Sequence, residues 1–289
     1  MLRSGKYKVF IIGLGQIGGS LGYDLVTGSF ATDVIGYDNV ISVCNYARRN
    51  KAVNRTVRTV AKGIRQADII FLSTPIRETG KILPSVCKIA GKGQIILDVT
   101  GVKTGVFKTL KTLDFPANYL SCHPVAGTER TGIEGARKGL FKAARFIIIP
   151  LRDKDVAAVR PVAFLAKSIG SWPIIMKPGE HDRLIALTSN LPHALALCLT
   201  KLANEQARLN PNIRHMIGGS FKSASRVAFS SSELILDMFL TNSENVSSAI
   251  ERFLSELKSM QQFIKGRNEK KLIELIELAK ATEGVGHNE

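Results

Sequence analysis

The sequence predicts an α/β fold, in which a mainly parallel β-sheet domain precedes an all-helical domain. Strand-like and helix-like segments alternate over the first half of the 289 residues, as expected for a parallel sheet covered by helices. A glycine-rich turn at residues 13–18 follows the first apolar run. From Gly179 onward the period-2 pattern of strands disappears and helical periodicity replaces it. We therefore predict one domain over residues 1–178 and a second, helical domain over residues 179–289.

The first predicted strand, residues 9–12 (VFII), leads into three glycines at the spacing of a dinucleotide-binding loop. Gly13 permits the tight turn, and Gly15 lets a pyrophosphate approach the backbone. Gly18 allows the following helix to pack closely on the strand. This pattern predicts a Rossmann-type domain. The alternative is a glycine-rich turn in an α/β unit that binds no phosphate.

The elements after the loop favour the dinucleotide. A helix predicted over residues 17–27 offers free backbone N–H groups at its start, near Gln16 and Ile17, to the phosphates. The second strand, residues 34–37, ends in Asp38, which lies 20 residues past the third glycine. A carboxylate at that distance accepts hydrogen bonds from the ribose hydroxyls of NAD.

The rest of the first domain is predicted from apolar runs and from the residues that end them. Residues 67–72 form a buried strand, and its carboxyl end carries the polar turn Ser73-Thr74-Pro75, where ligands bind in such sheets. Pro84 is expected to kink or break a helix, and Gly170 suits the end of another. The remaining predictions are helices at 41–51, 79–90 and 155–168, and strands at 56–59, 94–99, 119–122, 146–149 and 172–176.

The second domain shows helical periodicity and more apolar residues than one small domain can bury. Its predicted helices are 181–203, interrupted by Pro192, and then 232–240, 245–265 and 269–281. Because the surplus apolar face needs a partner, we expect this domain to pack against a second copy in a homodimer. The polar tail at 282–289 is expected to be loose.

Composition excludes several classes of protein. No apolar run approaches the roughly 20 residues that span a bilayer, and the N-terminus shows no signal peptide. We therefore expect a cytoplasmic protein that does not associate with a membrane. The four cysteines form no CxxC pair, which argues against a metal site and against disulfides.

The net charge of +16 raises the question of nucleic acid. The lysines and arginines are dispersed and do not alternate with aromatic residues, so we expect no specific nucleic-acid function. The charge is compatible with anionic small molecules or with a generally basic surface.

Three histidines occupy suggestive places. His123 follows a predicted strand, where side chains face the cofactor crevice, and imidazole is the natural base at neutral pH. The alternative is a structural histidine held by hydrogen bonds. His181 and His193 lie 12 residues apart around Pro192, whose distortion of the helix is expected to line a pocket with Ser189 and Asn190.

Together these segments resemble a known family. The stretches HPVAGTERTG, HDRLIALTSNLPH and GGSFKSASR follow a GLGQIGGS loop in this order, from Val9 to about Val246. They look like the prephenate and arogenate dehydrogenases of tyrosine biosynthesis. The resemblance implies a helical dimerisation domain, with the active site in the cleft between that domain and the nucleotide domain.

The resemblance also implies roles for individual residues. His123 would hydrogen-bond the ring hydroxyl of the substrate and accept its proton, and Arg226 would grip a substrate carboxylate. His193 would help hold the substrate side chain, while His181 would support the interface between the domains. The predicted substrate contacts further include Asn190, Gly101 and Thr128, and the predicted cofactor contacts are Gly13, Gly15, Gln16, Ile17, Gly18, Asp38, Ser73, Thr74, Pro75 and Thr100.

Two positions depart from the family pattern. Gly101, in DVTGVK, stands where the family often has serine, which removes a hydroxyl that would touch substrate and nicotinamide. Thr100 is considered as its substitute. Asn190, in SNLPH, replaces a common histidine and cannot carry a charge. Both changes affect the selection of substrate.

We therefore expect an NAD-dependent enzyme that oxidises and decarboxylates prephenate or arogenate. Asp38 would repel the 2′-phosphate of NADP, although Arg48 and Arg49 lie in the next helix. Three alternatives stay open. One is another dehydrogenase of the β-hydroxyacid type, which would need a catalytic lysine in the helical domain. The second is a catalytically silent NAD-binding sensor, and the third is a nucleic-acid-binding protein whose charge serves phosphate contacts.

Overall fold

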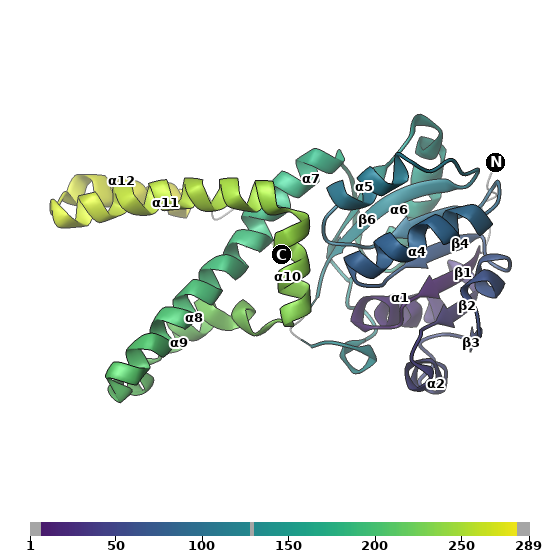
Figure 1. The fold of residues 1–289 in the computed structure, drawn as a ribbon, viewed down its shortest axis with the longest axis horizontal. Coiled ribbons are helices and arrows are strands. Elements are labelled where there is room, and N and C mark those ends of the chain that lie inside the picture. The colour runs from purple at the N-terminus through teal and green to yellow at the C-terminus, as the bar shows by residue number, and fades with distance from the viewer. Residues whose placement is uncertain (1–6, 128–129, 282–289) are drawn as a thin grey trace.

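The computed structural model describes residues 7–127 and 130–281, and its first domain is built on one β-sheet (Figure 1). In this part of the chain, eight strands lie in the order β3-β2-β1-β4-β5-β6-β7-β8. Neighbours are parallel except β6 and β7, so the predicted mainly parallel sheet is confirmed. The strands are β1 (Tyr7–Ile12), β2 (Ala31–Tyr37), β3 (Arg55–Thr56), β4 (Ile69–Leu72), β5 (Ile95–Asp98), β6 (Asn118–Val125), β7 (Arg145–Pro150) and β8 (Trp172–Ile175).

Helices cover both faces of this sheet, which explains why its strands are continuous apolar runs in the sequence. Alternate side chains of β1 enter two separate cores, Val9 and Ile11 on one face and Phe10 and Ile12 on the other. The first core is closed by α1 (Gln16–Thr27) and α6 (Val159–Ser168), and the second by α3 (Val60–Ile64), α4 (Ile76–Ile89) and α5 (Thr104–Leu110).

The strand order reverses beside β1, which pairs with β2 on one side and with β4 on the other. Ligands of open α/β sheets bind at such a switch point, outside the carboxyl ends of the strands. Gly13 follows β1 there, and Ser73 follows β4, with its N–H donating to the carbonyl oxygen of Ile12 at 2.8 Å. The fold therefore brings the predicted phosphate loop and the polar turn at 73–75 together.

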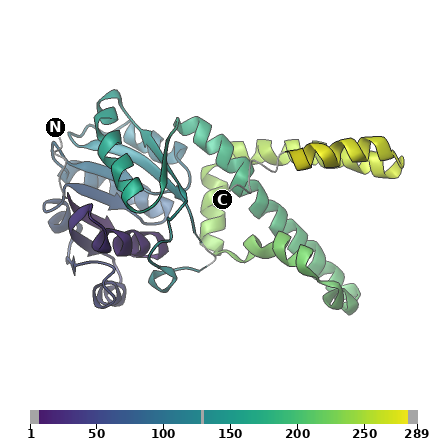
Figure 2. The same ribbon diagram turned by 180° about the vertical axis from the view of Figure 1, so that it is seen from behind.

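The second domain is helical, and its long helices extend away from the sheet as two diverging arms (Figures 1 and 2). One arm carries α8 and α9, and the other carries α11 with α12 running along it. α10 lies on the side that faces the sheet domain. The helices are α7 (Pro178–Ile185), α8 (Leu191–Leu209), α9 (Gly219–Ser225), α10 (Ser232–Thr241), α11 (Ser243–Lys265) and α12 (Glu269–Ala281).

Several predicted helices differ in detail from those observed. Helix α4 continues through Pro84, so the expected break does not occur, because buried Leu83, Val86 and Cys87 anchor the helix on the sheet around it. The predicted helix at 181–203 is divided by a π-helical turn, Ala186–Asn190, and Pro192 lies in the first turn of α8, where its missing N–H is tolerated. Short helices α3, α5 and α9 were not predicted, and α2 spans Ile41–Arg49.

Irregular helical turns connect the remaining elements. These 3₁₀ turns are Ile133–Gly135, Asp153–Ala158, Pro211–Met216 and Arg226–Phe229, the second of which replaces the start of the predicted helix at 155–168. Across residues 7–127 and 130–281, none of the helices combines the length and apolar character needed to cross a bilayer. The same residues contain no group of three or more His, Cys, Asp or Glu side chains placed to hold a metal ion.

Candidate active site

The glycine loop after β1 is tight at its first and third glycines and open at its second. Gly13 has φ of +89°, and a Cβ there would lie 2.5 Å from the carbonyl oxygen of Ser73. A Cβ on Gly18 would lie 2.0 Å from the carbonyl oxygen of Gly13. A Cβ on Gly15, by contrast, would meet no atom within 4 Å. This open backbone at the start of α1 fits the pyrophosphate of a dinucleotide.

Asp38 lies beside the loop, at the carboxyl end of β2. Its carboxylate accepts hydrogen bonds from the backbone N–H of Leu14 at 2.9 Å and of Val40 at 3.0 Å. A carboxylate has about four acceptor sites, so capacity remains for ribose hydroxyls. Gln16 begins α1, and the partly buried Ile17 packs on the core beneath the loop. These residues are arranged as a cofactor site requires, although the contacts themselves stay predictions.

The polar turn after β4 adds a second wall to the crevice. The Ser73 hydroxyl is buried and finds no hydrogen-bond partner among the described residues. Thr74 and Thr79 join their hydroxyl groups at 2.9 Å, and exposed Pro75 precedes α4. An unpartnered buried hydroxyl beside an open glycine loop fits a bound dinucleotide, because buried polar groups are normally hydrogen-bonded.

His123 lies in β6 and contacts a histidine of the other domain. Its Nδ1 is 2.9 Å from Nε2 of His181, which lies in α7. The Nδ1 of His181 is in turn 2.9 Å from Oδ1 of Asp182. His181 and Asp182 are buried, whereas His123 is half-buried. A continuous chain of three side chains therefore joins the sheet domain to the helical domain, and His181 lies at the interface where it was predicted.

Asp182 is the anchor of this chain and also holds the loop before α5. Its carboxylate accepts hydrogen bonds from the N–H of Lys103 at 2.9 Å and of Thr104 at 2.7 Å, and from the Thr104 hydroxyl at 2.5 Å. Burial alone would raise the pKa of Asp182, but these bonds and the one from His181 lower it below its usual value. Asp182 is therefore an ionised acceptor at neutral pH.

Lys103 is a second buried anchor, next to His123. The Lys103 side chain is fully buried, and its Nζ donates to the carbonyl oxygens of Thr100 and Cys122, each at 2.6 Å, and to Asp98 at 3.2 Å. Asp98 also accepts from the hydroxyls of Thr100 and Tyr119, each at 2.5 Å. The Thr100 hydroxyl is thus turned inward to Asp98, so its role as a substitute for the serine missing at position 101 stays a prediction that this geometry does not favour.

The surroundings of His123 favour its neutral form. Burial is the largest cause that lowers its pKa well below the usual value, and the ammonium of Lys103 and the neighbouring His181 lower it further. The carboxylate of Asp182 opposes this effect. An imidazole that stays unprotonated at neutral pH is available as a proton acceptor.

Near the π-helical turn at 186–190, His193 is partly accessible whereas Asn190 is buried. His193 is half-buried, and its Nδ1 donates to the carbonyl oxygen of Ser189 at 2.9 Å, which leaves Nε2 as an acceptor in the neutral ring. Asn190 is buried, and its side-chain oxygen accepts from Asn242, which also donates to the carbonyl oxygen of Asp182. Asn190 thus packs between helices, and its contact with substrate stays a prediction that this burial does not favour.

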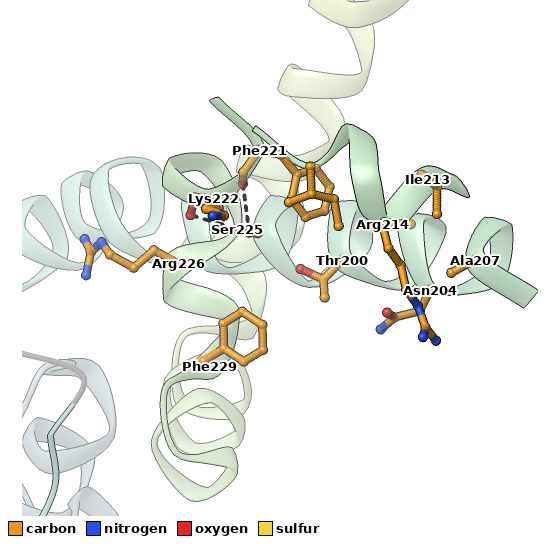
Figure 3. Close-up of a pocket in the computed structure, with 12 residues that line it drawn as sticks. Thr200, Asn204, Ala207, Ile213, Arg214, Phe221, Lys222, Ser225, Arg226 and Phe229 are labelled. Carbon is orange, nitrogen blue, oxygen red and sulfur yellow. Dashed lines mark hydrogen bonds between the residues drawn. The ribbon is translucent and has the colours of Figure 1, made fainter. Parts of the chain in front are cut away.

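Arg226 is exposed at the end of α9, and its guanidinium points away from Phe221, Phe229 and Thr200 in Figure 3. Those three residues and Arg226 itself line a cavity of about 590 Å³ that lies within the helical domain. None of the hydrogen-bonded residues His123, His181 and Asp182 lines this cavity. We therefore place the candidate active site at the interface between the domains. The cavity is a hollow between α8, α9 and the 3₁₀ turns on either side of α9.

Gly101 and Thr128 are the remaining predicted substrate contacts. Gly101 is exposed, and a Cβ there would meet no atom within 4 Å, so the backbone leaves open space where the family often has serine. Thr128 lies outside the described residues.

Sequence reasoning missed Asp182, Lys103 and Asp98. Asp182 is adjacent to His181, and Asp98 ends a strand on the crevice side, so both carried a weak signal. Lys103 carried none, because its two closest partners are backbone carbonyls that only the fold assembles.

Comparison with known proteins gives matches over most of the chain. A family model for the nucleotide-binding domain of prephenate dehydrogenase matches residues 21–174, and one for the prephenate dehydrogenase dimerization domain matches residues 177–278. A cyclohexadienyl dehydrogenase of Zymomonas mobilis is 30% identical over 271 residues, which cover 92% of this chain and 91% of that protein. A prephenate dehydrogenase of Bacillus subtilis is 23% identical, over 95% of this chain and 75% of its own length.

Solved structures agree with these matches. The prephenate dehydrogenase of A. aeolicus, in complex with hydroxyphenyl propionate and NAD⁺, superposes with a TM-score of 0.87 and 27% identity and covers 98% of both chains. The arogenate dehydrogenase of Synechocystis has the same fold, with a TM-score of 0.81 and 24% identity over 96% of this chain and 99% of its own.

Proposed function

The chain belongs to the prephenate dehydrogenase family, and we propose that it oxidises and decarboxylates prephenate or arogenate with His123 as base and Arg226 as carboxylate clamp. It is an NAD-dependent dehydrogenase, and tyrosine synthesis is the process it serves. One observation carries the assignment of the base: a half-buried His123 in β6, whose surroundings favour its neutral form, is held by a buried His–Asp pair from the other domain.

The chemistry requires few protein groups. The substrate is a cyclohexadiene with an alcohol para to the carbon that bears a carboxylate. His123 accepts the hydroxyl proton as hydride leaves the alcohol carbon, and NAD, when bound, supplies the hydride acceptor. The resulting conjugated ketone withdraws electrons from the bond to the carboxylate. Loss of CO₂ makes the ring aromatic, and His123 can return its proton to the phenolic oxygen.

The residues of the glycine loop would hold the cofactor. The open backbone at Gly15 would accept the pyrophosphate, Asp38 the ribose hydroxyls, and the unpartnered hydroxyl of Ser73 a further polar atom of the dinucleotide. We propose NAD rather than NADP because the negative charge of Asp38 would repel a 2′-phosphate.

Arg226 would bind a substrate carboxylate through its planar, permanently charged guanidinium. It begins the 3₁₀ turn Arg226–Phe229, and in Figure 3 it extends away from the interior of the helical domain. His193, with Nε2 as an acceptor, would contact the side chain of the substrate. We further propose a homodimer through the helical domain, which the match to a dimerization domain supports.

The function is tested by following NADH or NADPH formation at 340 nm with prephenate or arogenate, each with NAD or NADP. We expect turnover and CO₂ release with NAD and at least one of the two substrates. Absence of turnover in all four pairings, with NAD still bound, would contradict the proposed function and favour a silent NAD-binding sensor.

A further inference from the structure

Beyond the role of His123 itself, we infer that His181 and Asp182 fix the tautomer of His123, so that its Nδ1 carries the proton and its Nε2 is free to act as base. This inference rests on the proposed function of His123. His181 acts through His123 as a positioning residue and has no proposed contact with substrate or cofactor. The inference follows from which atom donates and which accepts in the two hydrogen bonds that join His123, His181 and Asp182.

Asp182 is the acceptor at one end of the hydrogen-bonded series Asp182–His181–His123. Both of its oxygens receive hydrogen bonds from Lys103 and Thr104, and its side chain is fully buried. An ionised carboxylate can only accept, so the Nδ1 of His181, 2.9 Å away, must donate. A neutral His181 with its proton on Nδ1 presents Nε2 as an acceptor.

The contact between His181 and His123 then determines which nitrogen of His123 carries the proton. The Nε2 of His181 is 2.9 Å from Nδ1 of His123, and since it accepts, His123 must donate from Nδ1. Neutral imidazole carries one ring proton, so Nε2 of His123 is left without one. The two ring centroids lie 5.1 Å apart and the ring planes meet at 71°.

The opposite direction would need a doubly protonated His181. Its cation would then lie near the buried ammonium of Lys103, whose Nζ bonds the carbonyl oxygen of Cys122, the residue before His123. The direction assigned here needs only neutral rings with one proton each, and it adds no further charge to this buried site.

The chain also couples the base to the arrangement of the domains. His123 belongs to β6 of the sheet domain, whereas His181 and Asp182 belong to α7 of the helical domain. Asp182 binds the loop before α5 as well, so α7 is held against the sheet domain at the position that orients His123. His123 is consequently set as a base where the two domains meet.

The tautomer is tested directly by ¹⁵N NMR of histidine-labelled enzyme at pH 8, with His123 assigned from the signal that His123→Asn removes. We expect His123 with a protonated Nδ1 and an unprotonated Nε2. A wild-type His123 that carries its proton on Nε2 would overturn the inference, and this result does not depend on the folding of any variant.

A matched pair of variants tests the consequence for turnover. His181→Asn keeps a donor for Asp182 but does not reach His123, whereas His181→Gln keeps an amide oxygen near the former Nε2. We expect His181→Asn to lower kcat by about 10–100-fold, the usual effect of removing a partner that orients a histidine, with the Kd for NAD unchanged. His181→Gln should recover most of this loss and keep the Nδ1 proton on His123.

A control and a second criterion complete the test. His215→Asn, at an exposed histidine of the helical domain, should leave kcat unchanged. If wild-type enzyme turns over but His181→Asn retains its kcat and its His123 tautomer, the inference is wrong. If wild-type enzyme turns over neither substrate, the proposed function has failed instead.

Discussion

At the scale of single residues, the protonation of His123 is governed first by its burial and then by neighbours that are distant in the sequence. Lys103, His181 and Asp182 surround it, and their partners lie up to 79 residues apart along the chain. His123 itself and the three glycines were predictable, because a strand end and a glycine spacing are local patterns. Asp182 and Lys103 were not, since a buried hydrogen-bond partner leaves no periodic signal in a sequence.

The lowered pKa of His123 predicts the pH dependence of the reaction. A base must be unprotonated, and a pKa well below 6.5 keeps this form dominant as the pH falls through 6.5. We expect kcat/KM to stay level between pH 8 and about 6.5 and to fall only at more acidic pH. A pH series of kcat/KM in constant ionic strength measures this, and an acid limb centred at pH 6.5 or above would contradict it.

Arg226 is expected to act on substrate binding more than on chemistry. Replacement by alanine removes charge-assisted hydrogen bonds to a carboxylate, each of which contributes roughly 1.5–3 kcal/mol. Arg226→Ala should therefore raise KM by about 10–100-fold with a smaller effect on kcat, as initial rates over a range of substrate concentrations would show. Lys222→Ala, which removes an exposed charge from α9, serves as the control. Equal KM values in the two variants would show that Arg226 does not bind the substrate carboxylate.

At the scale of elements, the strands were the most predictable part of the fold. All eight predicted strands overlap observed ones, because a sheet buried on both faces needs short, continuous apolar runs. The short helices α3, α5 and α9 were missed, since 5 to 7 residues are too few to show helical periodicity. The π-helical turn before α8 depends on packing and had only Pro192 as a local sign.

The glycine loop and α1 allow a test that separates folding from cofactor binding. An alanine Cβ at position 18 would lie 2.0 Å from the carbonyl oxygen of Gly13, so α1 must move away from β1. At position 15 the same Cβ enters open space. Gly18→Ala should thus lower Tm and weaken NAD binding, whereas Gly15→Ala should keep Tm and weaken NAD binding alone.

Thermal unfolding and calorimetric titration with NAD would measure the two effects. The pair of variants is internally controlled, because both add one methyl group to the same loop. Undiminished NAD affinity in Gly15→Ala would show that the pyrophosphate does not lie over this glycine.

At the scale of the whole molecule, the change of periodicity near residue 179 predicted two regions of different architecture, and the structure has them. The exact boundary stays a prediction. The sequence did not reveal that the helices would diverge as two arms, because the arrangement of helices depends on contacts between distant faces (Figures 1 and 2). Nor did it reveal the ion pair between Arg77 of α4 and Asp237 of α10, which joins the domains at 2.5 Å.

The arms leave many large apolar side chains exposed in the single chain. On α11 and α12 these are Leu254, Leu257, Met260, Ile264, Ile273, Ile276 and Leu278. A stable soluble protein rarely exposes such an extended apolar surface, so this arm is the surface we expect a second copy to cover.

The double variant Leu257→Glu, Met260→Glu places two charges on this surface of α11 and should dissociate the dimer. The physical reason is that burying unpaired carboxylates in an apolar interface is strongly unfavourable. Sedimentation velocity would show the shift from dimer to monomer. Ser255→Glu, which adds a charge to the same helix without removing an apolar side chain, should stay dimeric. A double variant that remains fully dimeric would place the interface elsewhere.

The central claim is that His123 is the base of an NAD-dependent oxidative decarboxylation, and turnover by His123→Asn tests it most directly. Asparagine retains a hydrogen-bonding side chain but cannot accept the proton, so kcat should fall by about 10²–10⁴, the usual contribution of a general base. The Kd for NAD, measured by titration of the same preparation, should be unchanged. Wild-type kcat in His123→Asn would contradict the account.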